Sequence, residues 1–134
     1  MLDEPTSGLD SLTSYIIVDN LRKLAHNEGR TVLMTIHQPS IEIYDMFDRL
    51  LLMAEGQMVY QGSSKVAVDY FDRHFELKCP EFTNPAEFFI KMLHHEDPEN
   101  VKRYPQYFEA YDKEVMVQVE REIQGVPKSP YTKR

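Results

Sequence analysis

The chain has 134 residues, of which 42% are hydrophobic, 11% are aromatic and 28% are charged, and its formal net charge is −7. This length suits one domain with a real core, and the apolar content excludes a wholly disordered chain. The acidic balance argues against a nucleic-acid partner, and no apolar run approaches the roughly 18–20 residues of a membrane-spanning helix.

A long helix is predicted directly after the first ten residues. Apolar side chains recur at helical spacing from residue 11 to about residue 26, and either Ser11 or Asp10 can cap the start. Gly29 suits the left-handed conformation that ends such a helix. The apolar positions of this predicted helix are Leu12, Tyr15, Ile16, Leu21 and Leu24.

The middle of the chain predicts an extended segment, a short helix and a hairpin. Residues 31–36 are nearly all apolar, which is typical of a strand buried on both faces of a parallel sheet. Ser40 then caps a short helix that runs to about residue 47. Residues 50–53 and 57–61 predict a β-hairpin around a turn at Glu55 and Gly56. A helix followed by a buried strand is the order of an α/β domain.

Two more helices are predicted after the hairpin. Ser63 or Ser64 caps a helix over residues 65–75. Asn84 caps the other, which covers residues 85–93 and begins with a proline, a residue suited to the first helical position. Both helices carry aromatic side chains that a core would bury.

Beyond residue 93 the composition changes. Residues 94–105 are charged and predict turns, whereas apolar residues at spacings of three and four predict a last amphipathic helix over residues 107–124. The basic, proline-containing residues 127–134 predict a mobile tail.

Two carboxylates and a histidine fall where the predicted strands end. Asp3 and Glu4 stand where a strand would give way to a loop, and His37 follows residues 31–36. Ligands bind at this edge of open α/β folds. One carboxylate could hold a hard cation while the other polarises a water, and the histidine could bind a phosphate. The alternative is that the carboxylate pair is a solvated loop and the histidine is structural.

These residues carry a resemblance to a known family. Residues 2–11 resemble the end of a Walker B motif followed by the D-loop of an ABC transporter nucleotide-binding domain, and residues 35–40 resemble its switch-histidine loop. The sequence after the histidine, Gln38-Pro39-Ser40, resembles that of the G subfamily, the White-type half-transporters. The likeness continues in residues 47–52, 59–62, 79–80 and 84–89.

The resemblance implies a role for each matching residue. Asp3 would help to hold Mg²⁺, Glu4 would be the general base that activates the attacking water, and His37 would contact the γ-phosphate of ATP. The D-loop crosses to the partner subunit in this family. The remaining nucleotide-binding candidates are Gln38 and the D-loop residues Ser7, Gly8, Leu9 and Asp10.

The fold that the resemblance implies is α/β, the C-terminal part of a P-loop NTPase (ABC ATPase) domain. It would have mostly parallel strands, a β-hairpin and a helical C-terminal extension. Residues 1–75 would form the partial nucleotide-binding domain, and residues 76–134 a helical linker toward a transmembrane domain.

Other parts of an ABC nucleotide-binding domain have no counterpart in this sequence. None of the five glycines is followed by lysine or by a second glycine, so neither a Walker A motif nor the signature loop is present. We therefore expect this chain alone to bind ATP weakly and not to hydrolyse it.

The expected function is that of a partial ATP-hydrolysing subunit of a transporter that exports lipid, sterol, pigment or xenobiotic. Its partners would be a second nucleotide-binding domain and the transmembrane domain. It would sit at the cytoplasmic face of the membrane through that parent protein, while the chain itself would be soluble. The single cysteine fits a cytosolic compartment. The alternatives are a non-catalytic interaction module and an incomplete gene product.

Overall fold

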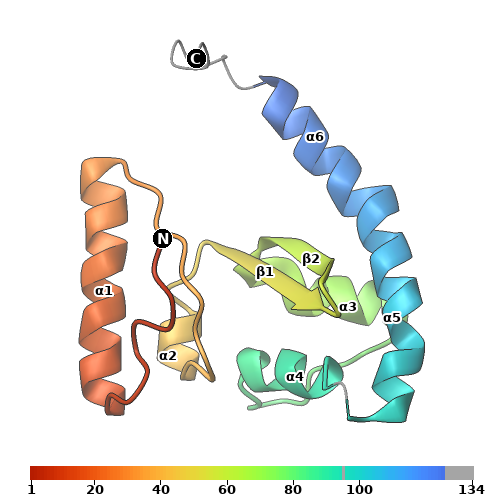
Figure 1. Ribbon diagram of the computed structural model, residues 1–134, viewed down its shortest axis with the longest axis horizontal. Coiled ribbons are helices and arrows are strands. Elements are labelled where there is room, and N and C mark those ends of the chain that lie inside the picture. The colour runs from red at the N-terminus through yellow and green to blue at the C-terminus, as the bar shows by residue number, and fades with distance from the viewer. Residues whose placement is uncertain (95, 126–134) are drawn as a thin grey trace.

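A β-hairpin forms the centre of the computed structural model, which describes residues 1–94 and 96–125 (Figure 1). Strand β1 (Arg49–Ala54) pairs antiparallel with β2 (Gln57–Ser63), and the register shifts between Leu52 and Met53. The turn residues Glu55 and Gly56 both have positive φ, as a two-residue hairpin turn of type I′ requires. The predicted hairpin and its turn are confirmed.

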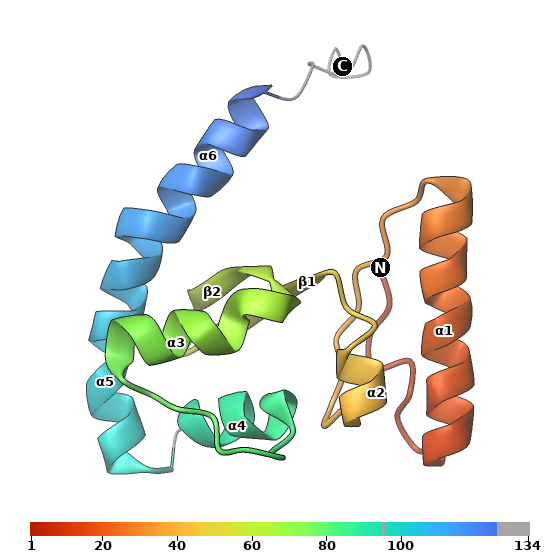
Figure 2. The ribbon, with the colours of Figure 1, turned by 180° about the vertical axis from the view of Figure 1, so that it is seen from behind.

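Helices pack against this hairpin and bury its apolar side. A 3₁₀ turn (Ser64–Val66), capped by Ser63, leads into α3 (Ala67–Phe75), and Asn84 caps α4 (Pro85–Met92). Figure 2 shows α3 crossing one face of the hairpin with α4 below it. These elements and α5 (Pro98–Ala110) supply one buried cluster, which includes Val59, Phe71, Phe89 and Tyr107.

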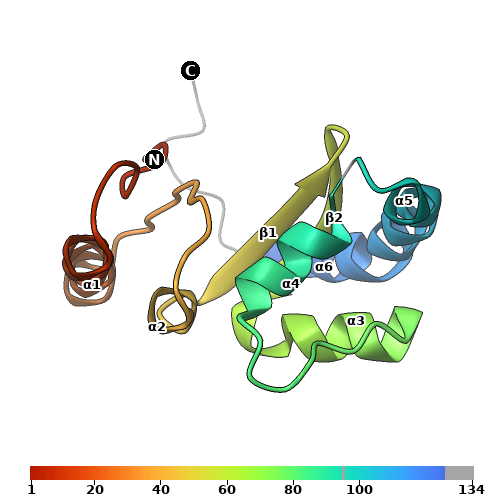
Figure 3. The ribbon, with the colours of Figure 1, turned by 90° about the horizontal axis from the view of Figure 1, so that it is seen from below.

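The N-terminal helix α1 (Ser11–Glu28) stands apart from the hairpin, and the short helix α2 (Ile41–Tyr44) lies between them (Figure 3). As predicted, Asp10 is the N-cap of α1, and Gly29 ends α1 with φ of 61°. Ser40 caps α2, which is shorter than expected. Many apolar side chains of α1 do not face inward. Val18 is buried, as is the polar Ser14, whereas Leu12, Tyr15, Ile16 and Leu24 are exposed.

The predicted strand over residues 31–36 is not a strand in the described part of the chain. It is an extended segment with one isolated parallel bridge, between Leu2 and Met34. Strands buried on both faces need neighbours on both sides, and the described residues supply a partner on one side only. Leu33 is 47% exposed, so this segment is not buried on both faces. The sheet of the described residues is the two-stranded antiparallel hairpin, and the P-loop NTPase fold stays a prediction.

The prediction of turns over residues 94–105 is wrong for much of that stretch. Asp97 caps α5 by accepting a hydrogen bond from the backbone N–H of Glu99 at 2.9 Å, and Pro105 lies inside the helix. A proline costs a helix roughly 3 kcal/mol, but burying Tyr104 and Tyr107 on the hairpin offsets that cost. A π-helical turn (Tyr111–Val115) then continues into α6 (Met116–Gly125).

In Figure 1, α5 and α6 run as one long helix whose far end leaves the body of the molecule. This confirms a helix over most of residues 107–124 and shows that it starts well before residue 107. His95 and the tail predicted over residues 127–134 lie outside the described residues.

Candidate functional site

The Asp3–Glu4 loop is held against the extended segment that leads to His37. The backbone N–H of Glu4 donates to Thr35 Oγ1 at 2.9 Å, and that hydroxyl donates to Asp3 Oδ1 at 2.5 Å. The Leu2 bridge adds backbone hydrogen bonds on both sides of Met34. The Asp3–Glu4 loop thus meets residues 33–35, two positions before His37, and the predicted grouping of the two carboxylates with the histidine stays a prediction.

The segment that resembles a D-loop is a tight series of turns. Ser7 N–H donates to the carbonyl of Glu4 at 3.0 Å, Leu9 N–H donates to the carbonyl of Thr6 at 3.3 Å, and Gly8 has φ of 74°. A residue with a Cβ is strained at that φ, so glycine is the suitable residue there.

Asp10 already has a structural task at the end of these turns. Its carboxylate accepts hydrogen bonds from the hydroxyl of Thr13 at 2.7 Å and from the Thr13 backbone N–H at 3.0 Å. These bonds lower the pKa of Asp10 from its usual value, with the larger effect from the Thr13 hydroxyl and the smaller one from the Thr13 N–H. In this structure the Asp10 side chain therefore caps α1.

The segment that resembles a switch-histidine loop turns sharply after His37. Gln38 has φ of 47°, in the left-handed region, and Pro39 is buried. The side-chain amide of Asn84 donates to the carbonyl of Pro39 at 2.7 Å, while its Oδ1 accepts from the backbone N–H of Ala86 at 3.0 Å. The sequence identified Asn84 as a helix cap, but no local signal announced its bond to a loop 45 positions earlier.

Residues of both loops line one cavity of about 250 Å³. His37 and Gln38 meet Leu9 there, whereas Asp3, Glu4, Ser7, Gly8 and Asp10 do not belong to its lining. The remaining residues come from the two loops themselves, from α1 and α2, and from the start of α4. They are Thr6, Ser11, Ser14, Ile36, Pro39, Ser40, Ile43, Asn84 and Glu87.

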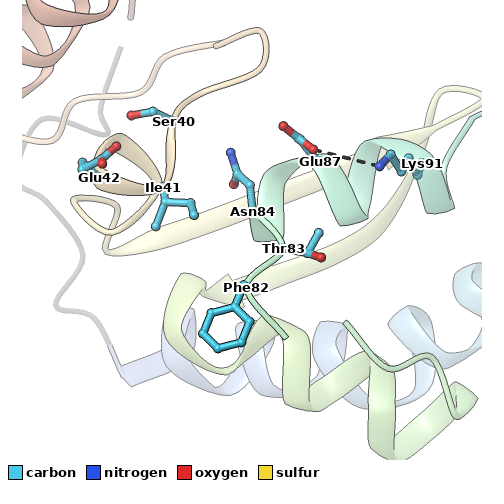
Figure 4. A pocket seen from close by; sticks show the side chains of 8 residues that line it. All are labelled: Ser40, Ile41, Glu42, Phe82, Thr83, Asn84, Glu87 and Lys91. Carbon is cyan, nitrogen blue, oxygen red and sulfur yellow. Dashed lines mark ion pairs between the residues drawn. The ribbon is translucent and has the colours of Figure 1, made fainter. Parts of the chain in front are cut away.

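A second cavity, of about 500 Å³, lies between α2 and α4 and shares Ser40, Asn84 and Glu87 with the first (Figure 4). Glu87 faces Lys91 across one turn of α4 at 4.0 Å. Asn84 stands between the two cavities and supports both the His37 loop and α4. The sequence predicted only its role as a helix cap and did not predict its bond to the His37 loop.

The carboxylate of Asp3 could be one ligand of a metal ion that a substrate also binds. Residues 1–94 and 96–125 contain no group of three or more His, Cys, Asp or Glu side chains that could hold a metal by themselves. Mg²⁺ is commonly bound through one or two carboxylates, waters and substrate phosphates. The Asp3 carboxylate, exposed and oriented by Thr35, fits one ligand of such a shared site.

Comparison with known proteins relates the chain to membrane transporters. A family model described as ABC-2 type transporter matches residues 37–109. The chain is 50% identical over 93 residues to ABC transporter G family member 1 of Dictyostelium discoideum, covering 69% of this chain and 12% of that protein. It is 48% identical over 91 residues to Protein white of Drosophila melanogaster, covering 68% of this chain and 13% of that protein.

A further relative aligns with nearly the whole chain. The ABC-type transporter eriD of Hericium erinaceus is 42% identical over 135 residues, which cover 96% of this chain and 9% of that protein. The chain therefore spans 9% to 13% of the length of these relatives. Among the helices that the structure describes, none is both long enough and apolar enough to cross a membrane.

Proposed function

Because the chain belongs to the G subfamily of ABC transporters, we propose that it supplies the hydrolytic edge of a nucleotide-binding domain. The observation that carries the proposal is the pair of hydrogen bonds through Thr35, which join the Asp3–Glu4 loop to the segment ending at His37. A carboxylate pair and a histidine form a coherent set for phosphoryl transfer, which depends on positioning and charge neutralisation.

Each proposed role follows from the chemistry of the side chain. Glu4 accepts a proton from the attacking water and orients it toward the γ-phosphate of ATP. His37 donates a hydrogen bond to that phosphate from the cavity that it lines with Gln38. Asp3 is the carboxylate that would hold Mg²⁺. When bound, this ion neutralises the charge on the phosphates.

The wider role of the parent protein follows from family membership. The transporter would couple ATP hydrolysis to the export of lipid, sterol, pigment or xenobiotic, with this part at the cytoplasmic face of the membrane. The D-loop, residues 7–10, would contact a second nucleotide-binding domain, and the C-terminal helices would lead toward the transmembrane domain.

A chimeric transporter tests the proposal. This chain replaces the aligned segment of the Dictyostelium relative, and ATP hydrolysis and ATP binding are measured for Glu4→Gln. Removing a general base should lower turnover by at least about 100-fold while ATP binding is retained. The matched control is Glu81→Gln, which changes an exposed glutamate in the turn before α4. Turnover unaffected by Glu4→Gln would remove Glu4 as the base.

A further inference from the structure

The hydroxyl of Thr35 touches both residues of the carboxylate pair. It accepts the backbone N–H of Glu4 at 2.9 Å and donates its own proton to Asp3 Oδ1 at 2.5 Å. A hydroxyl has one donor and two acceptor positions, so it can make both bonds at once. The backbone N–H of Thr35 donates to the carbonyl of Leu2 at 3.1 Å, which fixes the hydroxyl relative to the loop.

Glu4 needs an external constraint of this kind. Its φ of 43° lies in the left-handed region, which residues with a Cβ seldom adopt. The bond to Thr35 fixes the peptide plane before Glu4, and the bond from the Ser7 N–H to the Glu4 carbonyl at 3.0 Å anchors the plane after it, so the two bonds together favour this conformation. The backbone conformation sets the direction of the Cα–Cβ bond, and therefore where the carboxylate of Glu4 can reach.

Asp3 is oriented by the other half of the same contact. The Thr35 hydroxyl donates a hydrogen bond to Oδ1 of Asp3, and this bond fixes the rotation of the Asp3 carboxyl group. A charge-assisted O–H···O⁻ hydrogen bond is among the stronger ones available to a side chain. One hydroxyl thus sets the orientation of both candidate groups, and a methyl group of equal size could do neither.

We infer that Thr35 is a positioning residue for the Asp3–Glu4 pair, an inference that rests on the proposed function of that pair. Thr35 takes no part in the chemistry. It anchors the peptide plane that enters Glu4 and presents the Asp3 carboxylate in one orientation.

The test compares Thr35→Val, which keeps the shape and removes the hydroxyl, with Thr35→Ser, which keeps the hydroxyl. Thr31→Val is the matched control, because Thr31 is an exposed threonine four residues earlier in the same extended segment. The first measurement is amide hydrogen exchange at Glu4 by NMR in the full chain. The second is the kcat and KM for ATP of the chimeric transporter.

We expect Thr35→Val to speed exchange at the Glu4 amide by about tenfold, the effect of losing one hydrogen bond. It should also lower kcat by about tenfold and leave the KM for ATP within about twofold, because positioning acts on the chemical step. Thr35→Ser should restore both readouts, and Thr31→Val should match the unchanged chain.

The outcomes separate this inference from the proposed function. If Glu4→Gln abolishes turnover but Thr35→Val behaves like Thr31→Val in both measurements, the positioning role of Thr35 is overturned. If Glu4→Gln leaves turnover intact, the proposed function fails, and exchange at Glu4 still decides whether Thr35 holds the loop. If Thr35→Val destabilises the isolated chain, the kcat of Thr35→Ser in the transporter decides, because loss of turnover in that variant too would overturn the inference.

Discussion

Tyr44 lies at the point where α2 meets the hairpin, and only 4% of its surface is exposed. Its hydroxyl donates to the carbonyl of Ser64 at 2.9 Å, and Ser64 in turn donates to the carbonyl of Phe47. Burial, more than the neighbouring charges, raises the pKa of Tyr44 to about 12. Burial likewise raises the pKa of Tyr60, Tyr104, Tyr107 and Tyr111.

These tyrosines make the protein sensitive to alkaline pH. A raised pKa means that the folded state holds the phenolic proton more tightly than the unfolded chain does. The resulting stabilisation is complete below the ordinary pKa of 10.0 and is lost as pH rises toward about 12. Tyr44→Phe removes one such group. Between about pH 8 and about pH 11, the free energy of unfolding of this variant should therefore fall less than that of the unchanged chain.

Urea unfolding followed by circular dichroism at both pH values measures that difference. Tyr15→Phe is the control for loss of a phenolic hydroxyl, because Tyr15 is 41% exposed on α1. An equal loss of stability in Tyr44→Phe and Tyr15→Phe would contradict the prediction.

At the scale of elements, Asn84 links α4 to the loop that contains His37. Its Oδ1 caps the helix and its amide N–H donates to the carbonyl of Pro39. One side chain therefore fixes where α4 begins and where the loop before α2 runs. Gln38, strained at φ of 47°, lies directly before the proline that receives this bond.

Asn84→Asp separates the two contacts. The carboxylate keeps the acceptor that caps α4 but loses the donor, and it faces the carbonyl of Pro39 with a negative charge. We expect a loss of about 1–3 kcal/mol in stability and faster amide exchange in residues 37–40, while α4 remains helical.

The matched control is Asn100→Asp, because the amide of Asn100 donates to the carbonyl of Lys91 at the same distance of 2.7 Å, at the opposite end of α4 from Asn84. It should lower stability without changing exchange in residues 37–40. Unchanged exchange there in Asn84→Asp, measured by NMR, would show that Asn84 does not hold the loop.

For the whole molecule, one aromatic cluster joins the hairpin to α3, α4 and α5. Phe71 is fully buried, and its ring lies 6.0 Å from that of Tyr60, 5.5 Å from Phe89 and 5.9 Å from Tyr107. Each partner comes from a different element, so this side chain is a junction of the core. Aromatic pairs at these separations add to the free energy of burial.

Phe71→Ala should lower the free energy of unfolding by about 3–5 kcal/mol, because it leaves a cavity among these rings. That is a large share of the 5–15 kcal/mol that domains typically have. Phe82→Ala is the control: Phe82 is 100% exposed, so its loss should change stability by no more than about 0.5 kcal/mol. Urea unfolding measures both, and a loss below about 1 kcal/mol for Phe71→Ala would contradict the importance of the cluster.

The sequence predicted those features that depend on neighbouring residues. Asp10, Ser40 and Asn84 cap their helices because a short polar side chain reaches an N–H two or three positions ahead. The hairpin turn at Glu55 and Gly56 depends on the residues at the turn itself. The motifs also identified the G subfamily of ABC transporters, to which the comparisons assign the chain.

Tertiary structure decided what depends on distant partners. Residues 31–36 have the composition of a buried strand, yet a strand forms only where a second strand completes its hydrogen bonds, and Met34 bridges Leu2 alone among the described residues. Residues 94–105 have the composition of turns, yet burial of Tyr104 and Tyr107 keeps α5 helical.

The same holds for the candidate site. The residue types and the motif spacing predict which side chains act there, namely Asp3, Glu4 and His37. The sequence by itself did not determine what holds them, since Thr35 and Asn84 make their decisive bonds to residues 32 and 45 positions away. A hydrogen bond over such a separation forms only after the backbone is folded, and folding brought these residues together.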